Sequence, residues 1–202
     1  MNSFLKLLYR ITDLNTYALV HRRIFIWIFC QIGRKVKVTH RAEIFHHGNE
    51  RKQITLGDFV VLDGTLEVYK SGVITVGDFS YIGRARIYCA NRISIGHHCL
   101  VSDNVCMMDS DLHPFSASKR EMIASRWAEG EFPDVYTDTP NAPVVLEDHC
   151  WIGFGCAILK GVRIGEGAIV GSNSVVTKDV QPWTVVAGNP ARFIKEIPEN
   201  ER

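Results

Sequence analysis

The stretch that decides the fold runs from Leu146 to Val180 and reads LEDHCWIGFGCAILKGVRIGEGAIVGSNSVVTKDV. Every sixth residue is aliphatic: Leu146, Ile152, Ile158, Ile164, Val170 and Val176. The position four residues after each aliphatic holds a side chain of small or modest size: Cys150, Cys156, Val162, Ala168, Ser174 and Val180. A strand repeats every two residues and a helix about every 3.6, so this period fits neither alone. It predicts the flat sides of a coiled β-solenoid.

The same frame recurs upstream, in blocks that begin at residues 38, 56, 76 and 95. Its large positions there are Val38, Ile44, Leu56, Leu62, Val68, Val76, Ile82, Ile95, Val101 and Met107. The block starts differ by 18, 20 and 19 residues, so one turn takes three hexapeptides with an occasional extra residue or two. Successive turns would stack at about 4.8 Å and place the aliphatic columns inside a triangular prism.

The frame breaks at His113, where an aliphatic residue is due after Met107. It returns only at Leu146, and the interval 114–145 contains four prolines and several charges. A loop longer than about 15 residues in a compact domain is usually functional or disordered. We therefore expect residues 114–145 to form an excursion that projects from the prism.

His113 is the candidate catalytic residue at this break. A histidine near neutral pH can act as a general base, taking the proton of a hydroxyl as its oxygen attacks a thioester. A carboxylate on the other ring nitrogen would fix the tautomer, and either Asp109 or Asp111 could supply it. The spacing also fits an ordinary loop histidine held by its neighbours.

Other histidines and the cysteines are weaker candidates. The pairs His97–His98 and His46–His47 stand in corners, and adjacent side chains on a strand point to opposite faces, so we expect no metal site. The six cysteines form no CxxC pair, which favours reduced thiols over a zinc or redox motif. Those of the repeat occupy small positions and would pack as small hydrophobic residues.

Composition predicts one soluble globular domain. The chain has 202 residues, 46% of them hydrophobic and 22% charged, and a formal charge of +1, which gives no reason to expect nucleic acid. The longest apolar run, Ile24 to Cys30, has seven residues, whereas a membrane-spanning helix needs about 20. Lys6 and Arg10 interrupt the N-terminal apolar residues, so we expect no secretory signal and a cytoplasmic location.

Residues 1–31 lack the hexapeptide frame and show helical spacing of apolar residues: Phe4, Leu7, Leu8, Ile11, Leu14, Tyr17 and Ala18. We expect a helical segment that caps the open first coil. Because it is basic as well as amphipathic, the alternative is weak contact with the inner surface of the membrane. Residues 32–197 would then form the β-helix domain, and residues 198–202 a solvated tail.

The frame, the stretch from Trp151 and the closing VVAGNPARFIKEI (residues 185–197) resemble the left-handed β-helix acyltransferases. The resemblance covers residues 34–197 and is to the maltose/galactoside O-acetyltransferase and polysaccharide O-acetyltransferase branch in particular. It implies a mainly β fold, a left-handed parallel β-helix of hexapeptide repeats. It also implies acetyl-CoA as co-substrate, no metal, and a homotrimer with donor sites between subunits.

The resemblance also implies roles for individual residues. The catalytic histidine of these enzymes stands in a His-Pro before a loop, as His113 does here. Trp151 would flank the pantetheine channel, and Phe154 replaces a small polar residue of the coenzyme site. The asparagine that holds the acceptor sugar has no counterpart, since the stretch around Gly83, Arg84 and Arg86 takes its place. The positions implied to contact the coenzyme are Phe154, Ser172, Thr177, Lys178, Arg192 and Lys195.

We therefore expect an acyl-CoA-dependent O-acetyltransferase acting on a sugar hydroxyl, in the biosynthesis of a surface polysaccharide or oligosaccharide. A backbone N–H near Gly153–Gly155 would stabilise the oxyanion. The same base could instead support N-acetylation of an amino sugar or an antibiotic. The remaining alternatives are a metal-dependent solenoid hydratase of the carbonic anhydrase type and a non-catalytic β-helix spacer.

Overall fold

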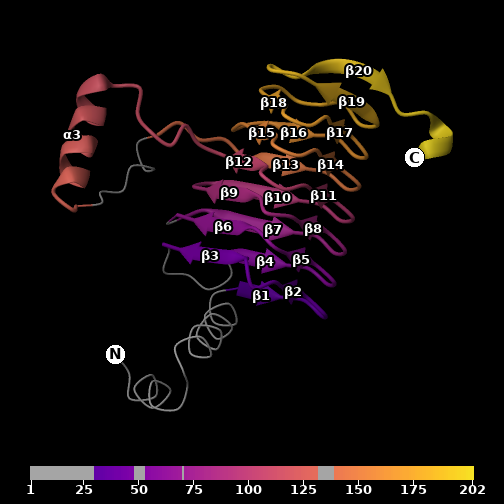
Figure 1. Ribbon diagram of the computed structural model, residues 1–202, viewed down its shortest axis with the longest axis horizontal. Coiled ribbons are helices and arrows are strands. Elements are labelled where there is room, and N and C mark those ends of the chain that lie inside the picture. The colour runs from indigo at the N-terminus through magenta and orange to yellow at the C-terminus, as the bar shows by residue number, and fades with distance from the viewer. Residues whose placement is uncertain (1–29, 48–52, 70, 132–138) are drawn as a thin grey trace, which may run out of the picture.

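The computed structural model describes residues 30–47, 53–69, 71–131 and 139–202. Over these residues the chain winds into a parallel β-solenoid of about seven turns, with one helix held away from the stack (Figure 1). Three sheets form the sides of the prism, with six, eight and six strands, and we call them sheets A, B and C. This is the fold expected from the hexapeptide frame, and it is consistent with a left-handed β-helix.

Each of the first six coils gives one strand to each sheet, in the order A, B, C, and the last two strands both join sheet B. Sheet A contains β1 (Cys30–Ile32), β4 (Ile54–Leu56), β7 (Val73–Val76), β10 (Arg92–Ile95), β13 (Val144–Leu146) and β16 (Arg163–Ile164). Sheet B contains β2 (Lys37–Val38), β5 (Val61–Leu62), β8 (Tyr81–Ile82), β11 (Leu100–Val101), β14 (Trp151–Ile152), β17 (Ile169–Val170), β19 (Thr184–Ala187) and β20 (Arg192–Glu196). Sheet C contains β3 (Glu43–His46), β6 (Thr65–Val68), β9 (Arg86–Cys89), β12 (Cys106–Met108), β15 (Ala157–Ile158) and β18 (Val175–Val176).

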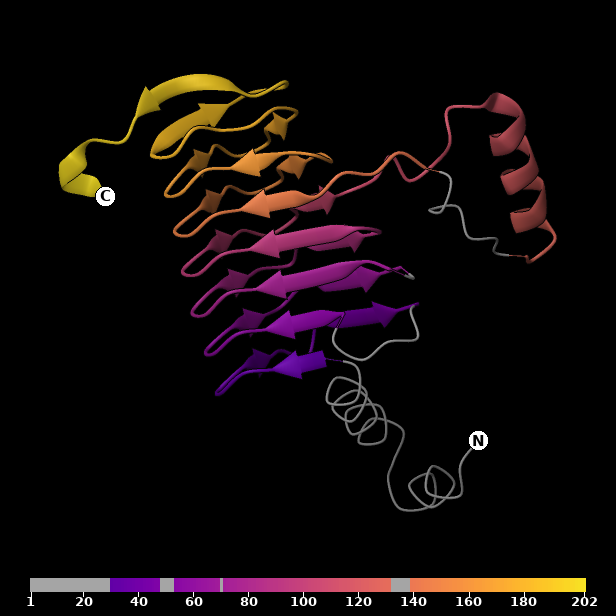
Figure 2. The ribbon, with the colours of Figure 1, turned by 180° about the vertical axis from the view of Figure 1, so that it is seen from behind.

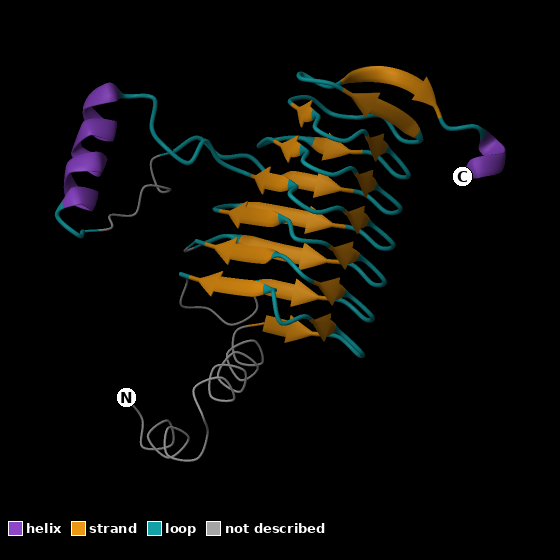
Figure 3. Cartoon of the chain, viewed as in Figure 1, coloured by secondary structure: helices purple, strands orange, loops and turns teal. Residues whose placement is uncertain are grey.

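The frame sets the register of the stack. Leu62, Ile82 and Val101 are consecutive partners in sheet B, and each is a large position of its own coil. Parallel pairing continues up to β19, against which β20 folds back antiparallel and closes the last coil (Figure 3). Because every coil repeats the frame, large side chains of successive coils lie directly above one another.

The predicted large and small positions form the core. Ile152, Ile158 and Ile164 expose no surface, and the small positions Cys150 and Ala168 are equally buried. The predicted burial is confirmed from Leu56 to Val180. Val38 and Ile44 on the first coil are only partly buried, and residues 1–29, which precede this coil, lie outside the described residues.

The corner between sheets A and B, the AB corner, repeats one backbone conformation. Its turn residues have positive φ in successive coils: Lys35, Phe59, Phe79, His98, His149, Gly167 and Trp183, with φ between 53° and 64°. Because the turns superpose, their side chains stack. The ring centroids of Phe79 and His98 lie 5.1 Å apart, and those of His98 and His149 5.2 Å apart, with the planes within 2° of parallel.

A second ladder at the AB corner satisfies backbone amides. The Asp58 carboxylate accepts a hydrogen bond from the Arg34 amide at 2.7 Å, and the Asp78 carboxylate accepts one from the Asp58 amide at the same distance. His97 takes the next place, since its Nδ1 accepts from the Asp78 amide at 3.0 Å. His97 therefore satisfies a backbone amide of the neighbouring coil, as the aspartates do at the other turns.

The interruption after β12 is an arm, residues 109–143, that leaves the prism at the corner between sheets C and A, the CA corner. It carries α3 (Ala117–Ala128), which projects away from the stack in both views (Figures 1 and 2). The sequence predicts the excursion as residues 114–145, whereas Val144 and Val145 already pair in β13, and it does not predict this helix. The Ser116 side chain caps its first turn by accepting from the Lys119 amide, and Glu129 ends it.

The two ends of the chain differ in part from expectation. The predicted helical segment 1–31 lies outside the described residues except for Cys30 and Gln31, which are already in β1, so the solenoid begins two residues before the expected boundary. The tail, residues 198–202, is exposed as expected and forms a 3₁₀ turn, Glu199–Glu201. Within the described residues no helix is long and apolar enough to cross a membrane.

Candidate functional site

Asp109 lies at the root of the arm and is fully buried. Its carboxylate accepts hydrogen bonds from the amides of Ala90 and Asn91, at 2.8 and 2.7 Å, and from the thiol of Cys89 at 3.3 Å. These donors belong to the CA corner of the preceding coil. Asp109 therefore anchors the arm to the prism, and its oxygens are already occupied.

Asp111 lies two residues further along and is held from the following coil. Its Oδ1 accepts a hydrogen bond from the Lys160 ammonium at 2.5 Å. Its Oδ2 is buried and has no hydrogen-bond partner among the described residues. Of the two aspartates predicted to orient His113, only Asp111 keeps an oxygen available for a donor.

His113 is exposed at the point where the arm leaves the prism. Its amide donates to the Asp111 carbonyl at 2.7 Å, and its imidazole meets the edge of the Trp127 indole on α3, with the ring centroids 5.6 Å apart. Leu112, between His113 and Asp111, has a positive φ of 61°. The exposed ring is accessible to an acceptor, as a general base must be.

Two predicted coenzyme residues share the CA corner with the arm. Thr177 and Lys178 follow β18, two coils beyond the departure of the arm, and both side chains are exposed. Lys160 follows β15, on the coil between the one where the arm departs and the one that ends in β18. The CA corner therefore presents His113, Lys160 and Lys178 on three successive coils.

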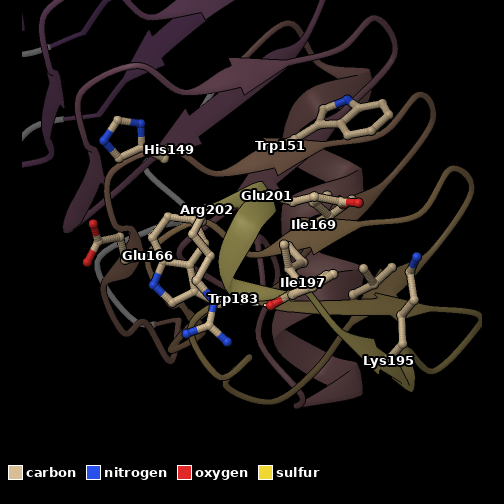
Figure 4. A pocket seen from close by; sticks show the side chains of 12 residues that line it. His149, Trp151, Glu166, Ile169, Trp183, Lys195, Ile197, Glu201 and Arg202 are labelled. Atoms are coloured by element: carbon tan, nitrogen blue, oxygen red, sulfur yellow. Dashed lines mark hydrogen bonds between the residues drawn. The ribbon is translucent and has the colours of Figure 1, made fainter.

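Another two predicted residues, Trp151 and Lys195, line a cavity of about 490 Å³ on the outer side of sheet B, which we call the C-terminal cavity (Figure 4). The indoles of Trp151 and Trp183 supply aromatic surface, and the Arg202 guanidinium lies 5.9 Å from the Trp183 ring. The remaining lining residues are His149, Glu166, Gly167, Ile169, Val185, Ile197, Pro198 and Glu201. Apolar walls with a few charged groups are typical of ligand sites.

Phe154 and Ser172 stand apart from that cavity, at the corner between sheets B and C, the BC corner, and Arg192 follows the same corner one coil later. All three are exposed, Phe154 by 47%. The amides of Gly153 and Gly155 already donate to the carbonyls of Val170 and Asp103. These two N–H groups, predicted to stabilise an oxyanion, are thus used by the stack.

The BC corner also contains Arg84, in the stretch that replaces the sugar-binding asparagine. Its amide and Nε donate to the Asp103 carboxylate at 2.9 and 2.7 Å. The side-chain hydrogen bond from Arg84 is the main cause that lowers the pKa of Asp103. Arg84 is therefore tied to the neighbouring coil, which limits its freedom to bind an acceptor.

The cysteines are free thiols, as predicted. Burial raises the pKa of Cys30 to about 12 and is also the main cause that raises the pKa of Cys89, Cys106 and Cys156. A thiol must ionise to act as a nucleophile, so these four are poorly suited to catalysis. Among the described residues, no three or more His, Cys, Asp or Glu side chains gather as a metal-binding group.

The predicted residues therefore form two groups that one chain does not bring together. The three predicted catalytic residues, Thr177 and Lys178 lie at the CA corner, whereas the other predicted coenzyme residues lie on sheet B or at the BC corner, and sheet C separates these two corners. Sequence reasoning missed Lys160 as the partner of Asp111, Trp127 against His113, and the part of the cavity formed by Trp183 and Arg202. No periodic signal marks these contacts, since they join different coils or the tail.

Comparisons with known proteins agree with the repeat. Residues 143–178 match the family model described as bacterial transferase hexapeptide (six repeats). Over 63 residues, 31% of this chain, the sequence is 51% identical to a 2,3,4,5-tetrahydropyridine-2,6-dicarboxylate N-acetyltransferase of Staphylococcus aureus. The matched stretch spans only 26% of that relative, so the chain covers about a quarter of the length of the curated relatives it matches.

Solved structures match over most of the chain. AntD, an N-acyltransferase from Bacillus cereus in complex with dTDP and 3-hydroxybutyryl-CoA, is 21% identical and covers 89% of both chains at a TM-score of 0.65. A hexapeptide-repeat acetyltransferase of Vibrio cholerae in complex with acetyl-CoA is 25% identical and covers 96% of this chain and 84% of its own, at a TM-score of 0.58.

The names of these proteins refine the resemblance. They support hexapeptide-repeat acetyltransferases in general, and two of the three are N-acyl- or N-acetyltransferases. The maltose/galactoside O-acetyltransferase branch stays a prediction. Residues 143–178 thus match the bacterial transferase hexapeptide repeats, within a solenoid that has the fold of a hexapeptide-repeat acetyltransferase.

Proposed function

We propose that this chain is an acyl-CoA-dependent O-acetyltransferase that transfers acetyl to a sugar hydroxyl, in the biosynthesis of a surface polysaccharide or oligosaccharide. The observation that carries the proposal is the exposed His113 at the longest break of the frame, two residues from a carboxylate with an oxygen that has no partner among the described residues. The other irregularities of the frame are insertions of one or two residues between coils, so a histidine at the start of a long interruption serves something other than the core.

The chemistry needs one base and no covalent intermediate. His113 takes the proton of the acceptor hydroxyl as its oxygen attacks the thioester carbonyl. The tetrahedral intermediate collapses, the carbon–sulfur bond breaks, and the coenzyme A thiolate takes the proton from the imidazolium. The products are the acetyl ester and free coenzyme A, and His113 returns to its neutral form.

The donor is proposed to lie along the last coils. Trp151 and the wall of the C-terminal cavity offer apolar contact for the pantetheine arm, and Lys178, Arg192 and Lys195 offer cations for phosphates. Acetyl-CoA or a related thioester is bound in the two solved structures described above.

The predicted catalytic and coenzyme residues lie at different corners of one prism. We therefore propose that copies of the chain assemble and bring these corners together. The CA corner of one copy would meet the BC corner of another, which a homotrimer of parallel prisms allows. The outer surface of sheet B carries exposed apolar residues suited to such a contact: Tyr81, Leu100 and Trp151 are exposed by 38%, 52% and 49%.

A second candidate is N-acetylation of an amino sugar. It is favoured by the names of the relatives, among them AntD in complex with dTDP, a nucleotide that carries sugars. The same base and the same donor site would serve either acceptor. An ester and an amide differ in stability to alkali, so one assay separates the two candidates.

The test is transfer of isotope-labelled acetyl from acetyl-CoA to a panel of sugars, oligosaccharides and nucleotide-linked amino sugars, followed by mass spectrometry. We expect label on a saccharide, removed by mild alkali. His113→Ala should lose about a hundredfold or more of the rate. His47→Ala, an exposed histidine on the first coil, is the matched control and should keep it. Alkali-stable label would establish the N-acetyl candidate. Absence of both transfer and coenzyme A binding would overturn the proposal.

A further inference from the structure

The arm is fixed at its root by contacts on both of its strands. The Asp111 amide donates to the Pro140 carbonyl at 3.1 Å, and the Ala142 amide donates to the Asp109 carbonyl at 2.9 Å. The outgoing and returning segments therefore pair with each other beside the prism. His113 follows directly on the outgoing segment, so its place depends on how this pairing is held.

Lys160 connects this root to the next coil. The amides on either side of it are both engaged: Leu159 donates to the Val176 carbonyl at 3.2 Å, and Gly161 donates to the Ala142 carbonyl at 3.0 Å. The backbone at Lys160 is thus held by the arm and by the following coil. From this position its ammonium reaches Asp111 at 2.5 Å, with the two side chains 32% and 23% exposed.

The two carboxylate oxygens of Asp111 have different environments. Its Oδ1 is bound to Lys160, whereas Oδ2 is buried without a partner among the described residues. A buried acceptor without a donor is unfavourable, because it has lost its hydrogen bonds to water and gained none in the protein. The His113 imidazole, which can donate a hydrogen bond, belongs to the residue two positions further along, and the amide of that residue already donates to the Asp111 carbonyl.

We propose that Lys160 is a positioning residue for His113 and acts through Asp111. By holding Oδ1, Lys160 fixes the carboxylate and leaves Oδ2 to accept a hydrogen bond from the imidazole when an acceptor is bound. The inference rests on the proposed function only for the identity of the reaction. The contact itself, and its effect on His113, can be measured without activity.

The charges around His113 give the direction of the effect. Trp127 on α3 is the neutral group against the ring, and Arg120 on α3 donates to the carbonyls of Pro114 and Phe115. Asp111 is the carboxylate two residues before His113, and it is paired with the Lys160 ammonium. Without Lys160, an unbalanced carboxylate two residues from His113 would favour the protonated imidazole, which cannot act as a base.

The experiment compares Lys160→Met, Lys160→Arg, Asp111→Asn and the double variant Lys160→Met/Asp111→Asn. The matched control is Arg163→Met, which removes an ion pair of the same length, to Glu147, three residues further along the chain. Two quantities are followed in each protein: kcat and KM for acetyl transfer, and the pH midpoint of hydrogen exchange at C2 of the His113 imidazole, read by mass spectrometry.

We expect Lys160→Met to lower kcat about 10- to 100-fold with little change in KM for acetyl-CoA, because a misplaced group loses rate and not donor affinity. The acidic limb of its pH–rate profile and the exchange midpoint of His113 should both move to higher pH. Lys160→Arg should retain most of the rate, and the double variant should return the midpoint toward that of the wild type. Arg163→Met should change neither quantity.

An unchanged His113 midpoint in Lys160→Met and Asp111→Asn would overturn the inference, whether or not the protein transfers acetyl. A shifted midpoint in a protein that transfers nothing would support the positioning role and reject the proposed reaction. The two failures are therefore distinguishable. A loss of rate in Lys160→Met that Arg163→Met reproduces would reduce the pair to a structural contact and also overturn the inference.

Discussion

The Trp183 indole lies directly over Gly167: a Cβ added to Gly167 would come within 2.2 Å of the ring. Gly167 also has a φ of 64°, which side chains rarely adopt. Because Gly167 has no side chain, the Trp183 indole can pack against this turn of the AB corner. It thereby forms a wall of the C-terminal cavity.

We expect Gly167→Ala to destabilise the protein for two reasons, backbone strain and overlap with Trp183. Gly130→Ala is the matched control, since Gly130 has a φ of 80° and nothing within 4 Å of its added Cβ. Gly167→Ala should lower the free energy of unfolding by about 2 kcal/mol more than Gly130→Ala. Chemical denaturation measures both, and equal losses would mean that Trp183 moves aside freely.

Asp109→Asn should reduce stability and not simply rate. The amide nitrogen would face at least one of the donors that now bind the carboxylate, leaving a buried N–H without an acceptor. The expected loss is about 2 kcal/mol in the free energy of unfolding. His113→Ala should leave the free energy of unfolding unchanged, because the ring is exposed, while it lowers the rate of transfer by about a hundredfold or more. The opposite pattern in these two variants would reverse the roles we assign to Asp109 and His113.

Acid should selectively weaken the contact between Arg84 and Asp103. Hydrogen bonding to Arg84 lowers the pKa of Asp103 in the folded protein below its unfolded value of about 3.9. The carboxylate therefore stabilises the fold above that value, and its contribution is lost as the pH falls through the lower, folded pKa.

Asp103→Asn tests this dependence. Its deficit in unfolding free energy relative to the wild type should be present at about pH 5 and shrink as the pH falls toward about 2. Glu131→Gln, which removes a carboxylate 3.9 Å from the Arg126 guanidinium and 65% exposed, serves as the control and should show little deficit at either pH. A deficit in Asp103→Asn that is constant with pH would contradict the assignment.

Trp151→Ala should raise KM for acetyl-CoA about tenfold with a small change in kcat, because the indole contributes binding surface and not chemistry. Phe193→Ala is the comparison: Phe193 is 61% exposed on β20, two residues from Lys195, yet does not line the cavity. Steady-state kinetics with acetyl-CoA as the varied substrate measures KM and kcat for both variants. Equal effects of the two substitutions would remove the C-terminal cavity from the donor site.

The prism could be predicted from the sequence because the core residues recur with a fixed period. Ile152 and Val101 could be placed inside from their positions in the frame alone, and both are fully buried. The place of the interruption followed from the missing aliphatic at His113. The helix α3 was missed because Pro114 and Pro133 mark the surrounding segment as loop, although Ser116 is a good cap for a helix between them.

The contacts around the candidate site could not be predicted in the same way. Lys160 and Asp111 are 49 residues apart and meet only because the arm leaves and returns at one corner. The stacked rings of His98 and His149 belong to coils separated by the whole arm. Such contacts depend on which corner each residue occupies. The hexapeptide frame indicates whether a side chain is buried in the prism, but it does not indicate which residues of other coils lie beside it at a corner.

The pairing of β10 with β13 and of β12 with β15 has a consequence for how this protein can diversify. Ile93 lies beside Val144, and Met107 beside Ile158, so the ladders continue past the arm as if coil four were followed directly by coil five. The arm interrupts the chain without interrupting the sheets. Its length and sequence can therefore vary with little cost to the core, because the coils on either side of it keep their pairing. A single scaffold of this kind can acquire new acceptors by exchanging one insertion.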